Sequence, residues 1–314
     1  MTSVIFMGTP DFSVPVLKGL VKHGYVVKAV VTQPDKRVGR KQKITKTPAK
    51  LAAEKLNLPV FQPAKLSGSK ELDNLIAMHA DLIVTAAYGQ FLPTKFLKSV
   101  KIAAVNVHGS LLPKYRGGAP VQYSLLNDDA ETGITIMEMV KKMDAGDIYA
   151  QKALKIEPDD TTGSLFTKLA ILGRDLLLET LPKIIDGSVR KIPQDPDKVV
   201  FSPNISKKQE KITLSMTATK ANNLIRALNP DPGAYLMVDG KRLKVWKAKV
   251  SKDQTKLEAG SLVSNKNRFA ISFANHTILD LLELQPAGKK RMTVKNFLNG
   301  QGSKFKPEEK IIDD

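Results

Sequence analysis

Strand patterns and helix patterns alternate along the first 190 residues of this 314-residue chain. Residues 3–8 form a short apolar run that ends in glycine, residues 12–23 carry apolar side chains at helical spacing, and residues 25–32 are rich in β-branched residues. A strand, a helix and a second strand in this order form a crossover between parallel strands. Because the alternation continues to residue 185, we predict an α/β fold with a Rossmann-like, doubly wound and mostly parallel sheet.

The composition changes after residue 187. Residues 187–204 contain a glycine and three prolines and show little periodicity, which is typical of a linker. Several short strand patterns follow, and two of them flank Asp239-Gly240, a strong signal for a two-residue hairpin. We therefore predict a first domain over residues 1–189, a linker over 190–205, and a small OB-like β-barrel domain over 206–314.

The positive charge of the chain is concentrated in two places. The formal net charge is +18, which favours a polyanionic partner, either nucleic acid or an anionic membrane surface. Residues 35–50, which we interpret as a loop, hold seven cations and one Asp, and residues 204–314 hold 21 Lys and Arg against 11 Asp and Glu. The rest of the first domain is close to neutral.

Several functional classes are disfavoured. The chain has no Cys, and its four His form no His-Glu-x-x-His pattern, so we expect no metal site. No apolar stretch reaches the ~18 residues of a membrane span, and the first residues read directly into a strand, so we expect a cytoplasmic protein. The first strand–helix turn has one glycine where a dinucleotide fingerprint needs three, which disfavours a nicotinamide dehydrogenase.

Three polar residues are candidates for chemistry. Asn106 and His108 alternate along one predicted strand, so they share a face near its carboxyl end, where sites form in α/β sheets. An amide and an imidazole side by side suit oxyanion stabilisation and proton transfer, although a hydrogen-bonded polar pair at a strand end is the alternative. Asp144 lies in an Asp-rich turn. It can hold His108 in its charged form if the two loops meet, and otherwise it is part of an ordinary turn.

Several segments together resemble the 10-formyltetrahydrofolate-dependent formyltransferase family. The sequences His-Gly-Ser-Leu-Leu-Pro at 108–113, Tyr-Arg-Gly-Gly-Ala-Pro at 115–120 and Met-Asp-Ala-Gly-Asp at 143–147 are similar to its signature blocks. Residues 8–12 and 32–35 resemble the N-terminal blocks of the branch that acts on methionyl-tRNA, and residues 229–234 resemble its second domain.

This resemblance implies the formyltransferase fold and a specific reaction. The formyl group of 10-formyltetrahydrofolate, the co-substrate, would pass to the α-amino group of methionyl initiator tRNA in translation initiation, without a metal. Asn106, His108 and Asp144 would be catalytic, and the folate would be bound by Ser110, Leu111, Leu112 and Pro113. We expect a monomer.

The basic segments then have a candidate ligand, the acceptor arm of the tRNA. The residues expected to contact it are Lys36, Arg37, Arg40, Lys41 and Lys43 in the first domain and Lys241, Arg242, Lys244 and Lys247 in the second. The alternative for both segments is a solvated charged surface. Two other functions stay open: a formyltransferase for a small amine, such as glycinamide ribonucleotide or an amino-sugar nucleotide, and a non-catalytic RNA-binding protein.

Overall fold

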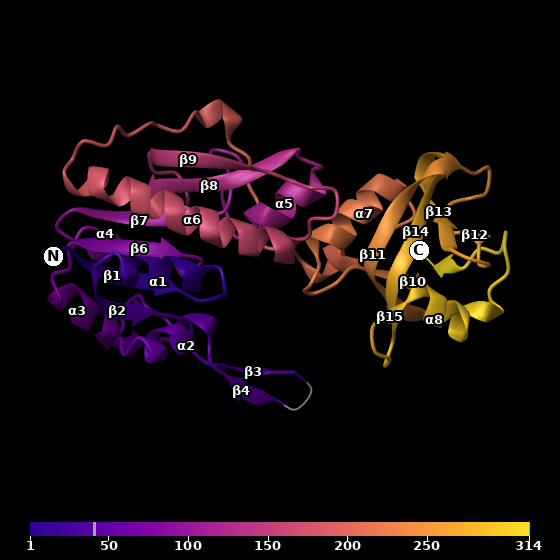
Figure 1. The fold of residues 1–314 in the computed structure, drawn as a ribbon, viewed down its shortest axis with the longest axis horizontal. Helices are drawn as coiled ribbons and strands as arrows, with labels where there is room; N and C mark the ends of the chain where they lie inside the picture. The colour runs from indigo at the N-terminus through magenta and orange to yellow at the C-terminus, as the bar shows by residue number, and fades with distance from the viewer. Residues whose placement is uncertain (40–41, 314) are drawn as a thin grey trace. The chain divides into compact units, whose positions relative to one another are not determined.

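The computed structural model describes residues 1–39 and 42–313 and divides into two compact units (Figure 1). Unit 1 comprises Met1–Pro120, Glu131–Ile156 and Leu165–Pro203. Unit 2 comprises Val121–Ala130, Glu157–Ser164 and Asn204–Asp314. The C-terminal unit thus includes two short segments that lie earlier in the sequence.

A seven-stranded sheet with the order β5-β2-β1-β6-β7-β8-β9 forms the centre of unit 1. Its strands are β1 (Ser3–Gly8), β2 (Val26–Val31), β5 (Val60–Phe61), β6 (Leu82–Ala86), β7 (Ala103–His108), β8 (Glu131–Glu138) and β9 (Ile148–Lys155). The first five strands in spatial order are parallel, and β8 and β9 continue the sheet in antiparallel pairing. The sheet is therefore mostly parallel, as the sequence predicts.

Helices cover both faces of this sheet because its strands alternate apolar side chains between the faces. The helices are α1 (Ser13–Lys22), α2 (Pro48–Lys55), α3 (Lys70–Ala77), α4 (Thr94–Leu97) and α6 (Thr162–Ile185). Ile5, Met7 and Ile83 belong to a buried cluster with Leu72 of α3 and Phe96 of α4. On the other face, Gly173 of α6 lies directly against the side chain of Val107 in β7.

The segment predicted as a loop at 35–50 contains a hairpin. Its strands, β3 (Lys36–Val38) and β4 (Lys43–Thr45), pair with each other in a separate two-stranded sheet, and residues 48–50 already belong to α2. The sequence did not predict this hairpin because its strands are three residues long and rich in cations, without an alternating apolar face. Arg40 and Lys41 lie outside the described residues.

Unit 2 is built around a curled antiparallel sheet with the order β12-β13-β14-β11-β10-β16. Its elements are α5 (Pro120–Leu126), α7 (Ala218–Ala227), β10 (Tyr235–Val238), β11 (Lys241–Gln254), β12 (Leu262–Ser264), β13 (Phe269–Ser272), β14 (Thr277–Pro286), β15 (Met292–Thr293), α8 (Val294–Leu298) and β16 (Ile312–Asp313). A bridge between Ser261 and Lys310 joins the chain next to β12 to the chain next to β16, so the sheet curls toward a barrel. Helices α7 and α8 supply Leu224 and Phe297 to its core.

Candidate active site

The carboxyl ends of β1, β2, β6 and β7 meet at one edge of the unit 1 sheet because these strands are parallel. Asn106 and His108 lie at the end of β7 on this edge. The hydroxyl of Thr85 in β6 donates to Oδ1 of Asn106 at 2.8 Å, which orients the amide. The Nδ2 group of Asn106 makes no hydrogen bond to any described residue, so it is free to donate to a ligand.

The imidazole of His108 is buried and is fixed by a main-chain carbonyl. Its Nε2 lies 2.9 Å from the carbonyl oxygen of Tyr115, which can only accept, so Nε2 carries a proton. Its Nδ1 faces Oδ1 of Asp144 at 3.9 Å. This distance is within the range of an ion pair and exceeds that of a hydrogen bond. The structure thus brings the predicted residues His108 and Asp144 together.

The loop that carries Asp144 is held in place by its neighbours. Oδ2 of Asp144 accepts a hydrogen bond from the main-chain N–H of Gly117 at 2.9 Å. The Nε2 group of Gln194 donates to the carbonyl oxygens of Asp144 and Gly146 at 2.9 and 2.7 Å. A Cβ at Gly146 would lie 2.0 Å from the carbonyl oxygen of Glu138, so the close approach of this loop to β8 requires glycine. Asp144 is therefore positioned from three sides.

The loop at 110–113 is attached to the antiparallel part of the sheet. The hydroxyl of Thr135 in β8 donates to the carbonyl of Ser110 at 2.7 Å and accepts from the N–H of Leu112 at 3.0 Å. Gln151 in β9 donates to the carbonyl of Leu112 at 2.7 Å. The side chains of Ser110 and Leu112 are buried, and the Ser110 hydroxyl donates to the carbonyl of Lys114. The carbonyls of residues 110–113 and the N–H of Leu112 are thus engaged within the protein, and the partly exposed side chains of this loop are Leu111 and Pro113.

Sequence reasoning did not single out four polar residues that organise this edge. They are Thr85, Thr135, Gln151 and Gln194. Gln194 lies in the Pro-containing segment expected to be a linker, and it also accepts from the Arg116 guanidinium at 2.8 Å. The sequence pattern of this segment gives no indication of such a role. Thr135 and Gln151, by contrast, lie on two predicted strands and are paired with each other in the sheet, so they could have been found as a polar pair.

The cations of the first basic segment divide into two groups. Lys36, Arg37 and Lys43 are exposed on β3 and β4 and form no ion pair with any described residue. Lys46 and Lys50, by contrast, pair with Glu54 and Asp35 at 2.8 and 2.7 Å. The hairpin therefore presents uncompensated positive charge to solvent.

The predicted basic residues of unit 2 lie on β11, whose pairing with β14 is irregular. The pairing of β11 with β14 shifts register between Val245 and Lys247. Lys241, Arg242 and Lys247 are exposed, whereas Lys244 is half-buried and donates to the carbonyl of Pro232 at 2.6 Å. Of these four, Lys244 is therefore the one most engaged within the protein.

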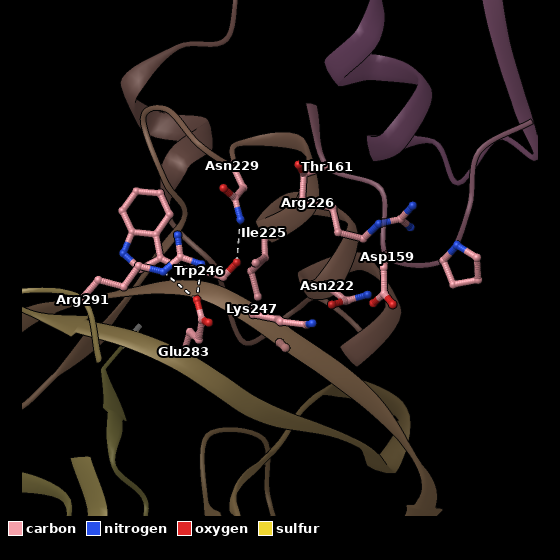
Figure 2. Close-up of a pocket in the computed structure, with 12 residues that line it drawn as sticks. Asp159, Thr161, Asn222, Ile225, Arg226, Asn229, Trp246, Lys247, Glu283 and Arg291 are labelled. Atoms are coloured by element: carbon pink, nitrogen blue, oxygen red, sulfur yellow. Dashed lines mark hydrogen bonds and ion pairs between the residues drawn. The ribbon is translucent and has the colours of Figure 1, made fainter. Parts of the chain in front are cut away.

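A polar pocket of about 290 Å³ opens in unit 2 beside β11 (Figure 2). Its lining includes Arg226, Trp246, Lys247 and Arg291, and Figure 2 shows Lys247 extending along it toward Asn222. The Arg226 guanidinium donates to the carbonyls of Asp160 and Glu157, and its burial lowers the pKa of Arg226. The lining also includes Asp159 and Glu283, and Glu283 pairs with Arg291, so the pocket carries side chains of both charges.

Two further observations concern the described residues alone. They contain no cluster of three or more His, Cys, Asp or Glu side chains placed to hold a metal ion. None of the helices described is long and apolar enough to cross a membrane.

Comparison with known proteins identifies the family. A family model described as formyl transferase matches residues 1–181, and one described as formyl transferase, C-terminal domain, matches residues 204–302. A protein from Lactobacillus acidophilus named methionyl-tRNA formyltransferase is 76% identical over 313 residues, covering 100% of both chains. One of the same name from Lactobacillus gasseri is 70% identical over 314 residues, with the same coverage.

A solved structure shares the fold at low sequence identity. It is an N-formyltransferase from Helicobacter canadensis in complex with folinic acid and dTDP-3-aminofucose, with a TM-score of 0.69, 19% identity, and coverage of 91% of this chain and 100% of that chain. The resemblance and the fold class predicted from the sequence are thus confirmed. Because both family models match and relatives align along its whole length, the chain belongs to the formyl transferase family.

Proposed function

We propose that this chain transfers the formyl group of 10-formyltetrahydrofolate to the α-amino group of methionyl initiator tRNA, as a monomer in the cytoplasm. The observation that carries the proposal is the 76% identity, along the full length of both chains, to a relative named methionyl-tRNA formyltransferase. The neighbour that binds an amino-sugar nucleotide is 19% identical and supports the fold alone.

Asn106 stabilises the oxyanion that forms in the first chemical step. When an amine attacks the formyl carbon, the carbonyl oxygen becomes an oxyanion that needs hydrogen-bond donors. The hydroxyl of Thr85 occupies Oδ1 of Asn106, so the Nδ2 donors face away from Thr85 and can stabilise this oxygen. The donor is already oriented before substrate binds, which is the condition under which such groups accelerate a reaction most.

His108 and Asp144 act on protons and charge. The carbonyl of Tyr115 fixes the proton on Nε2, so Nδ1 is the nitrogen that gains or loses a proton during the reaction. The carboxylate of Asp144, 3.9 Å from Nδ1, stabilises the imidazolium that helps the oxyanion form. The attacking amine must lose a proton, which His108 and Asp144 are placed to receive. When the tetrahedral intermediate collapses, the bond between the formyl carbon and N10 of the folate breaks, and N10 gains a proton as tetrahydrofolate leaves.

The binding residues complete the proposal. The loop of Ser110, Leu111, Leu112 and Pro113 holds the folate next to His108, mainly through the partly exposed side chains of Leu111 and Pro113. Lys36, Arg37, Arg40, Lys41 and Lys43 and the β11 cations Lys241, Arg242, Lys244 and Lys247 contact phosphates of the tRNA, and this contact releases counterions from the RNA.

A radiolabelled formyl-transfer assay tests the function. Purified protein, 10-formyltetrahydrofolate and charged initiator tRNA are expected to give labelled formylmethionyl-tRNA. The matched reactions contain glycinamide ribonucleotide or a dTDP-linked amino sugar at the same concentration as the tRNA. Faster transfer to either small amine than to methionyl-tRNA would refute the proposed acceptor and establish the small-amine alternative.

A further inference from the structure

Both ends of the β3–β4 hairpin are tied to the body of unit 1. The Thr32 hydroxyl after β2 and the Thr47 hydroxyl before α2 share a buried hydrogen bond of 2.8 Å. A second pair also joins the two ends: Nζ of Lys50 lies 2.7 Å from Oδ2 of Asp35. The second oxygen of Asp35 accepts from Nε2 of Gln62 at 2.7 Å. We call Asp35, Lys50 and Gln62 the clamp.

The clamp differs from an ordinary surface ion pair. The side chains of Lys50 and Asp35 are 18% and 20% exposed, whereas those of Lys46 and Glu54, which pair next to the same hairpin, are 47% and 39% exposed. Partly buried charges are screened less by water and salt, and Asp35 has both carboxylate oxygens satisfied. Hydrogen bonds from Lys50 and Gln62 also hold the pKa of Asp35 below its ordinary value.

A series of hydrogen bonds leads from the clamp to the edge of the sheet where the candidate active site lies. Gln62 also donates to the carbonyl of Gln33 at 2.9 Å, and the Gln33 amide donates to the carbonyl of Tyr88 at 3.1 Å. The Thr9 hydroxyl donates to the same carbonyl at 3.0 Å. The loops that follow β1, β2 and β6 are thereby joined, and β6 contributes Thr85, which orients Asn106.

We infer that Asp35 is a positioning residue, whose clamp to Lys50 and Gln62 fixes the direction of the basic hairpin relative to the catalytic edge. The inference rests on the proposed function. A hairpin of two three-residue strands is not stable by itself, so its direction depends on how its ends are held. A hairpin that points in several directions presents its cations correctly for part of the time, which weakens apparent affinity by that fraction.

The test uses two pairs of substitutions in the full-length protein. Asp35→Ala and Glu54→Ala each remove one negative charge, and Lys50→Met and Lys46→Met each remove one positive charge. KM for methionyl-tRNA and KM for 10-formyltetrahydrofolate are measured for all four. If the charge alone matters, both Ala variants bind tRNA slightly more tightly and both Met variants slightly less tightly.

The clamp gives a different pattern. Asp35→Ala and Lys50→Met are both expected to raise KM for tRNA about tenfold, the factor that corresponds to ~1.4 kcal/mol, in spite of their opposite charge changes. Glu54→Ala and Lys46→Met are expected to change it by less than about twofold, the size typical of an exposed pair. KM for the folate is expected to stay constant in all four variants, and Lys50→Arg to restore most of the tRNA affinity.

Two results would overturn the inference. The first is a KM for tRNA that changes with net charge across the four variants. The second is a KM for the folate that rises together with the KM for tRNA, because this would indicate general damage to the sheet edge. A wild-type protein that does not formylate methionyl-tRNA at all would instead contradict the proposed function, so the two failures are distinguishable.

Discussion

At the edge of the unit 1 sheet, His108 is buried and Asp144 is 16% exposed, and both contact fixed groups. Lys36 and Lys43 on the β3–β4 hairpin are instead exposed and pair with no described residue. The first arrangement defines where individual atoms lie. The second defines mainly how much positive charge faces solvent. A single substitution should therefore have a large effect at the sheet edge and a small, additive effect on the basic surfaces.

Replacement of His108 by Ala should have the largest effect. We expect kcat for formyl transfer to fall by at least about 10²–10³, the typical loss on removal of one group that stabilises an oxyanion. Affinity for tRNA should stay within about twofold, because His108 is buried and lies on no basic surface. Single-turnover rates and a direct binding assay measure the two quantities. An active variant would rule out the mechanism.

Gly146→Ala should disturb the same edge without removal of a catalytic group. A Cβ there would lie 2.0 Å from the carbonyl of Glu138, so the loop must move and take Asp144 with it. Since a displacement of about 1 Å can reduce the rate about 100-fold, we expect a loss of that size in kcat. Gln194→Ala loosens this loop without a clash and should give a smaller loss of the same kind. Normal kcat in Gly146→Ala would show that the position of Asp144 is unimportant.

Asp81 offers a carboxylate at the start of β6 for comparison with Asp144. The N–H and hydroxyl of Ser3 both donate to its Oδ2 at 2.7 Å, and they lower the pKa of Asp81. A lowered pKa in the folded state means that this contribution is present above the unfolded value of about 3.9 and is lost as the pH falls. We expect Asp81→Asn to reduce the free energy of unfolding by about 1–2 kcal/mol at pH 7, with kcat unchanged.

Denaturant unfolding at pH 7 and at pH 3.5 checks this prediction. The difference between wild type and Asp81→Asn should shrink at the lower pH, because Asp81 in the unfolded wild-type chain, where its pKa is not lowered, takes up a proton there and the unfolded state becomes relatively more stable. A constant difference between the two pH values would mean that the charge of Asp81 does not contribute to stability.

Single substitutions on the basic surfaces should have small effects. Lys36→Ala, Lys43→Ala and Lys247→Ala are each expected to weaken tRNA binding by about two- to fivefold and to reduce the slope of log affinity against log salt by about 0.7–0.9. Their effects should add, because these exposed residues share no partner among the described residues. A 100-fold loss from any one of them would contradict the contrast with the sheet edge.

Tyr88→Phe should have the smallest effect. The Tyr88 hydroxyl is buried, has no hydrogen-bond partner among the described residues, and has a pKa raised to about 12 by burial. Its removal should leave stability unchanged or raise it by up to about 1 kcal/mol, because an unsatisfied polar group disappears. Thermal unfolding measures this, and a large fall in formyl transfer would instead indicate that the hydroxyl contacts a substrate.

The sheet was predictable from the sequence because its strands carry continuous apolar runs such as residues 3–8 and 82–86, which few other structures can bury. Asn106 and His108 were predictable as neighbours because side chains alternate along a strand, and β7 ends directly after them. Their residue types suggested oxyanion stabilisation and proton transfer, the resemblance of the surrounding segments implied that they are catalytic, and this role stays a prediction.

Other features were not accessible from local patterns. The contact between His108 and Asp144 joins loops 36 residues apart, and Gln194 reaches the same loop from a Pro-containing segment without periodicity. The β3–β4 hairpin has no apolar face, and its position depends on pairs such as Asp35 with Lys50 that are distant in sequence. Long-range polar contacts of this kind leave no periodic signal in a single sequence.

The tied ends of the β3–β4 hairpin also have a practical meaning for protein engineering. Because Thr32 and Asp35 on one side meet Thr47 and Lys50 on the other, the chain between Asp35 and Lys50 behaves as an exchangeable cassette. Hairpins of other lengths or charges can be grafted between these two residues while the scaffold that carries Asn106 and His108 stays intact. If the hairpin contacts the acceptor as proposed, affinity for the acceptor can then be altered separately from the chemistry of formyl transfer.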